Sequence, residues 1–160
     1  MDAERCLTLH LLRREVLVAR DRGRVVIEFS DGAGEATDVR TARLLADELL
    51  AVVNLPLLGR HWWEIDRARA AEVVTTALHW DLETGRPAVP GSQAAALAEK
   101  ILAQFGDRAV YLSNVRATAD LTDAPRRWAS GHDVDELDAG VAVVSADLAG
   151  LLWVEDRPPA

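Results

Sequence analysis

The sequence predicts a single α+β domain whose sheet, antiparallel or mixed, has about five strands drawn from both ends of the chain. Three observations favour this class. Runs of β-branched and aromatic residues lie near both ends, apolar residues with helical spacing lie between them, and no repeat or linker divides the 160 residues. Because the predicted strands lie toward the two ends of the sequence and the predicted helices lie between them, we expect a middle block of three helices packed on one face of the sheet. We take residues 1–160 as one domain.

The N-terminal run is expected to be extended. Apolar and polar side chains alternate in the order Leu7, Thr8, Leu9, His10 and Leu11. This period of two is typical of a half-buried strand. Residues 16–19 either continue that strand or begin another, and residues 25–29 predict a further strand because they are β-branched and aromatic.

Three segments predict helices, at about residues 38–54, 66–80 and 92–105. Thr37 or Asp38 is a suitable N-cap for the first, and Ser92 for the third. The third has the clearest apolar face, made by Ala94, Leu97, Ala98, Ile101, Leu102 and Phe105. Gly106 follows this face and provides a stop.

The C-terminal third returns to strands. Residues 109–113 predict one strand, and residues 125–129 a short helix that begins at a proline. Two apolar runs, 141–144 and 151–154, flank a short loop that ends in glycine. This pattern predicts a β-hairpin.

The negative charge is concentrated near the C-terminus. The chain has a net charge of -8, and residues 120–156 hold nine acidic against two basic side chains, a net charge of -7. Such a field disfavours nucleic acid and anionic membranes and attracts a basic protein. Cys6 is the only cysteine, which suits a reducing, cytoplasmic setting, and we expect its thiol to be buried. Arginine-rich, lysine-poor composition favours a bacterial source.

No signature of catalysis, cofactor binding or metal binding stands out in the sequence. Residues 31–34 follow a strand and contain two glycines, but the third glycine and the lysine of phosphate-binding loops are missing. No pair of histidines or cysteines has zinc-ligand spacing. We therefore expect no catalytic residue, no metal site and no cofactor.

Aromatic and acidic residues make the best candidates for a binding surface. Trp62 and Trp63 are adjacent, so one of them faces outward if the segment is extended. Exposed tryptophan beside arginine is typical of a binding hot spot. The predicted partner-binding residues are Trp62, Trp63, Trp128, Asp133, Asp135, Glu136 and Asp138.

The favoured function is that of a non-enzymatic, acidic binding protein. A small acidic chain without a catalytic motif is typical of an immunity-type inhibitor that neutralises a bacterial toxin by covering its basic cleft. One alternative is a small enzyme or a ligand- or metal-binding protein that uses a group of His61, Glu64, His79 and His132. A second alternative is an adaptor or scaffold subunit.

Overall fold

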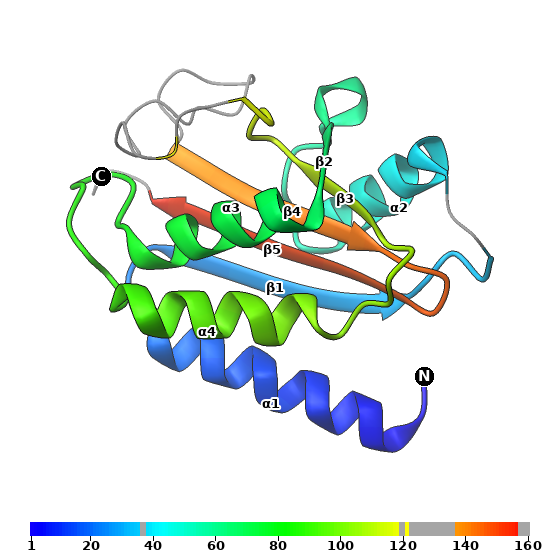
Figure 1. Cartoon of the computed structure of the whole chain (residues 1–160), viewed down its shortest axis with the longest axis horizontal. Helices are drawn as coiled ribbons and strands as arrows, with labels where there is room; N and C mark the ends of the chain where they lie inside the picture. Colours follow the sequence, from blue (N-terminus) through cyan, green and yellow to red (C-terminus); the bar gives the residue numbers. More distant parts are fainter. Residues whose placement is uncertain (36–37, 119–120, 122–136, 157–160) are drawn as a thin grey trace.

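The structure is a computed structural model that describes residues 1–35, 38–118, 121 and 137–156. In this part of the chain the elements are α1 (Ala3–Ala19), β1 (Arg24–Asp31), α2 (Val39–Val52), the 3-10 turn η1 (Gly59–His61), β2 (Trp63–Ile65), α3 (Arg67–His79), α4 (Gly91–Leu102), β3 (Val110–Ser113), β4 (Leu137–Val144) and β5 (Leu148–Asp156). The strands form one sheet in the order β1-β5-β4-β3-β2, and every neighbouring pair is antiparallel. The predicted α+β class, with strands from both chain ends, is confirmed (Figure 1).

The last strand lies inside the sheet, between the first strand and β4. The β4–β5 hairpin is the predicted one, although its loop is only residues 145–147 because β5 already begins at Leu148. On its other side β5 pairs with β1 over the whole of that strand, from Arg24 opposite Glu155 to Asp31 opposite Leu148. All nine residues of β5 are buried, so both of its faces need a covering layer.

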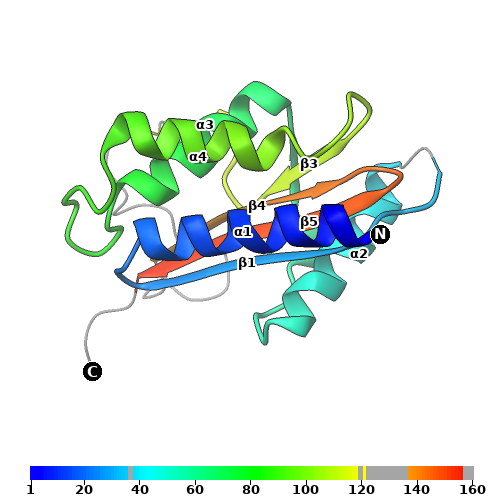
Figure 2. The same cartoon turned by 90° about the horizontal axis from the view of Figure 1, so that it is seen from below.

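The helices cover both faces of the sheet, which differs from the expected block on one face. Leu152 and Val154 pack into the core beneath α1, α3 and α4, whereas Leu151 and Trp153 point the other way into a core closed by α2. Figure 2 shows α2 on the side of the sheet opposite α3 and α4. The physical reason is that successive side chains of β5 point to opposite faces of the sheet and are apolar on both, so each face needs a covering helix.

The three predicted helices are present, and two of them begin at a capping aspartate. Asp38 accepts a hydrogen bond of 2.7 Å from the backbone N–H of Thr41 at the start of α2. Asp66 does the same for Arg69 at the start of α3, also at 2.7 Å. The prediction that Ser92 caps α4 was wrong: the helix begins at Gly91, and Pro90 at the N-cap position makes no side-chain capping bond. The helix ends at Leu102, three residues before Phe105.

The N-terminal prediction was wrong: residues 3–19 form a helix, not one or two strands. Asp2 caps this helix by accepting a bond of 2.8 Å from the N–H of Arg5. Leu9, Leu12 and Val16 are buried against the rest of the protein, at the spacing of one helical face. Leu7 and Leu11 lie on the exposed side instead. The alternation that suggested a strand therefore arises from a helix with apolar residues on two faces.

The short helix predicted at residues 125–129 lies outside the described residues. Within the described part of the chain, no helix combines the length and the apolar character that crossing a bilayer requires.

Candidate functional site

The two adjacent tryptophans lie where η1 passes into the edge strand β2, and they point to opposite sides. Trp62 is 1% exposed and Trp63 is 44% exposed. The segment around them is extended, so side chains of successive residues alternate. The prediction that one of the pair faces outward is confirmed, and the outward residue is Trp63.

Trp62 is the anchor of this junction. Its indole Nε1–H donates to Asp47 Oδ1 of α2 at 2.9 Å, and the same carboxylate accepts from the N–H groups of Leu58 and Gly59. Its ring meets that of Trp153 edge-on, with centroids 6.0 Å apart. Trp62 thus holds η1 onto α2, and its indole is not available to a partner in this structure, contrary to the expectation.

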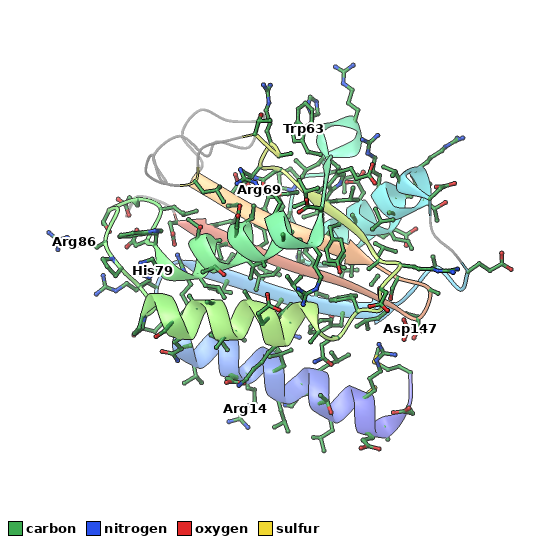
Figure 3. The ribbon with its side chains drawn as sticks, in the orientation of Figure 1. Arg14, Trp63, Arg69, His79, Arg86 and Asp147 are labelled. Carbon is green, nitrogen blue, oxygen red and sulfur yellow. The ribbon has the colours of Figure 1, made fainter. Side chains whose placement is uncertain are left out.

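Trp63 forms an exposed platform that is already held in one orientation. The guanidinium carbon of Arg116 lies 5.0 Å from the centroid of the indole ring, a cation–π geometry. The carbonyl of Arg116 accepts a bond of 3.2 Å from Arg69 of α3, and Arg69 also pairs with Glu72 at 2.9 Å. Because β2 is an edge strand, Trp63 stands at the margin of the sheet (Figure 3).

Asp138, predicted to contact a partner, is instead part of the interior. The residue is 6% exposed, and its Oδ2 accepts a bond of 3.2 Å from the indole N–H of Trp153. Gly140 makes this packing possible, because a Cβ there would lie 2.1 Å from a ring atom of Trp153. The predicted partner contacts at Asp133, Asp135, Glu136 and Trp128 lie outside the described residues.

The other C-terminal acidic residues of the described chain are paired with N-terminal arginines. The pairs are Arg5 with Asp147 at 2.5 Å, Arg24 with Glu155 at 2.9 Å and Arg20 with Asp156 at 2.6 Å. Glu155 and Asp156 are buried on opposite faces of the sheet. All three carboxylates join parts of the fold. Glu155 and Asp156 are buried, whereas the side chain of Asp147 is 58% exposed.

The histidine group proposed for an alternative site is not assembled. His61 and Glu64 lie just before α3, and His79 is the last residue of that helix. Thirteen helical residues separate the ends of α3 by about 20 Å. His79 Nδ1 is 2.5 Å from the carbonyl of Val89, and its ring lies 4.3 Å from that of Trp80 between centroids, tilted by 59°. His132 lies outside the described residues, among which no group of three metal-ligating side chains is found.

Two further sequence candidates have structural explanations. In the glycine-containing turn at residues 31–34, the N–H of Ala33 and that of Gly34 donate to the carbonyls of Ser145 and Ala146. These groups tie the turn to the β4–β5 hairpin and are not directed at an anion. Cys6 is exposed on α1, so the prediction of a buried thiol was wrong.

In the described part of the chain, the carboxylates of Asp38, Asp81 and Asp147 have pKa values below the usual one, and each shift has a structural cause. The backbone N–H of Thr41 lowers the pKa of Asp38, and Arg5 lowers that of Asp147. Burial acts to raise the pKa of Asp81, but hydrogen bonds from Thr84 and Glu83 outweigh it and lower the pKa overall. These are stabilised carboxylates, whereas a general acid near neutral pH needs its pKa raised.

No protein family, curated protein or solved structure matches the chain. Its function is therefore inferred from the geometry around Trp63.

Proposed function

We propose that this protein is a non-enzymatic binding protein, an immunity-type inhibitor that recognises a bacterial toxin with Trp63 at the centre of the contact. The observation that carries the proposal is the 44% exposure of a tryptophan held against Arg116. Tryptophan and arginine are the residues most enriched among those that dominate binding energy.

The support beneath Trp63 favours binding by a preformed surface. Trp62 is fixed to Asp47, and the carbonyl of Arg116 is fixed to Arg69. The residue before Trp63 and the residue whose guanidinium lies over its ring are thus bound to different helices, α2 and α3. A contact that is ordered before binding loses less conformational entropy when the partner arrives.

The charge of the molecule favours a basic partner. The net charge is -8. Long-range attraction would speed the encounter with a toxin whose cleft is basic, and desolvation of the indole would slow dissociation. Asp133, Asp135 and Glu136 would add to this attraction.

The test uses the product of the gene adjacent to that of this chain as the probe. Co-expression should relieve growth inhibition by that product, and the purified pair should bind one to one. Trp63→Ala should weaken binding by about 30-fold or more, because truncating a hot-spot tryptophan costs about 2 kcal/mol or more. Trp63→Phe should recover part of the affinity.

The matched control is Leu44→Ala, which removes an apolar side chain of α2 that is 61% exposed. It should leave affinity unchanged. In a second arm, Asp133→Asn, Asp135→Asn and Glu136→Gln together should slow association at low salt without changing dissociation. Equal affinities of wild type and Trp63→Ala would refute the role of Trp63, and turnover of a substrate by the isolated chain would refute the proposed class.

A further inference from the structure

Helix α1 presents a second apolar face, directed away from the sheet. Leu7 is 58% exposed, Leu11 is 53% exposed and Val18 is 77% exposed. With Arg14 they form one stripe along the helix, which we call the α1 stripe. A helix on the surface of a monomer normally turns polar residues outward, so the α1 stripe is an unpaired hydrophobic surface.

The spacing of the α1 stripe is that of a helix-pairing seam. Its residues Leu7, Leu11, Arg14 and Val18 follow one another at intervals of four, three and four. This alternation keeps the side chains facing one neighbouring helix over three turns. The occupant that fits the stripe is therefore a helix with the same spacing.

The surface beside the stripe has room for the side chains of such a helix. Two open hollows, of about 420 and 370 Å³, lie along α1 and both are lined by Leu11. One reaches Lys100 of α4 and Gln104, which follows the end of that helix, and the other reaches Gln93 in the first turn of α4. An ion pair of 2.5 Å between Lys100 and Glu15 joins the two helices across this region.

We propose that the α1 stripe pairs with the same stripe of a second copy, with the two α1 helices antiparallel. A two-fold axis between Leu11 and Arg14 places Leu7 opposite Val18 of the second copy. The same axis places Leu11 against the aliphatic stem of the opposing Arg14. One stripe then serves as both halves of a closed, isologous interface.

Charge and area favour a second copy as the occupant. Helix α1 itself holds three basic and two acidic side chains, a net charge of +1, whereas the whole chain has -8. The α1 face is thus a region where two acidic copies can approach without strong repulsion. A standard interface takes about 800 Å² from each partner, about a tenth of the 8626 Å² surface. A helix about 25 Å long, together with the hollow rims on α4, can supply it.

The dimer would leave the proposed partner site open. Figure 3 shows Arg14 of α1 and Trp63 on opposite sides of the molecule. The inference therefore does not depend on the proposed function. Failure of the dimer would leave Trp63 as a binding residue, and failure of Trp63 would leave the dimer.

The first experiment is sedimentation velocity of the full chain at concentrations up to about 100 µM. The wild type should sediment as twice its 17.4 kDa mass. Leu11→Glu should weaken self-association at least tenfold. At concentrations too low for the wild type to dimerise, the two proteins should melt at the same temperature, because the Leu11 side chain is exposed. The control Leu44→Glu, at a position 61% exposed on α2, should remain dimeric.

The second experiment tests the antiparallel orientation. In a Cys6→Ser background, the double variant Leu7→Cys/Val18→Cys should become a covalent dimer on mild oxidation. Leu7→Cys alone should not cross-link to itself. A monomeric wild type, a dimer lost in Leu44→Glu but kept in Leu11→Glu, or efficient cross-linking of Leu7→Cys alone would overturn the proposal. So would a monomer that binds anionic vesicles through α1.

Discussion

Replacing Asp156 with asparagine tests how strongly stability depends on the ion pair that joins the end of α1 to the end of β5. Asp156 Oδ2 lies 2.6 Å from Arg20 Nη2 and accepts a second bond of 2.6 Å from the N–H of Leu82. The Arg20 side chain is fully buried and that of Asp156 is 3% exposed. Arg20 also donates to the carbonyls of Trp80 and Arg22, so the variant leaves a guanidinium positioned by the fold but without its counter-ion.

Removing one partner of a buried pair costs about 3–5 kcal/mol, because the remaining charge stays desolvated. The asparagine oxygen can still accept from Leu82, so we expect the lower end, about 3 kcal/mol. That is a large part of the 5–15 kcal/mol, roughly, that holds a domain together. In urea at pH 7, with an m-value of about 2 kcal/mol/M, the unfolding midpoint should fall by about 1.5 M.

The matched control breaks an exposed pair. Arg67 and Glu99 are 2.8 Å apart, with side chains 47% and 56% exposed, so Glu99→Gln should cost less than about 1 kcal/mol. Replacing both buried partners, as Arg20→Met with Asp156→Leu, should recover stability relative to Asp156→Asn. A midpoint for Asp156→Asn within about 0.3 M of wild type would refute the reasoning from burial.

Two further predictions concern the packing of the core and the loss of stability at acidic pH. Ile101 of α4 is 4% exposed and belongs to the core. Its truncation to alanine should lower the free energy of unfolding by about 2–5 kcal/mol. Glu99→Ala on the outer side should cost less than about 0.5 kcal/mol, and the reverse order of melting temperatures would contradict the packing. Arg5 lowers the pKa of Asp147 below 3.8, so this carboxylate adds stability above that pH and loses it as pH falls through the lowered value. Asp147→Asn should flatten the fall of melting temperature below about pH 4, and an unchanged acid slope would count against the Arg5 contact.

Charge counting along the chain identified the acidic C-terminal region but not the fate of its carboxylates. Glu155 lies opposite Arg24 because of the β1–β5 register, which joins residues more than a hundred positions apart. Asp156 meets Arg20 because α1 ends beside that register. A count of charges carries no such pairing, so it could not predict that Glu155 and Asp156 are buried in internal contacts.

The tryptophan pair shows where local reasoning suffices and where it does not. Extended geometry alone predicts that Trp62 and Trp63 point apart. Which of them is buried depends on Asp47, a residue of α2 that no motif marks. The N-terminal helix was misjudged for a related reason. Leu7, Leu9 and Leu11 alternate with polar residues as in a strand. Only the tertiary structure shows that Leu9 is buried in the core, whereas Leu7 and Leu11 lie on the exposed face of α1.

The interior position of β5 constrains how this chain can acquire its structure during synthesis. Strand β1 is complete once residue 31 has been made, yet its partner on the sheet begins at residue 148. Until then β1 has no neighbour, and β4 lacks one of its two. Closing so long a loop is slow compared with forming local helices. The helices can therefore form early as the chain emerges from the ribosome, whereas the sheet closes in a late step that waits for the last strand.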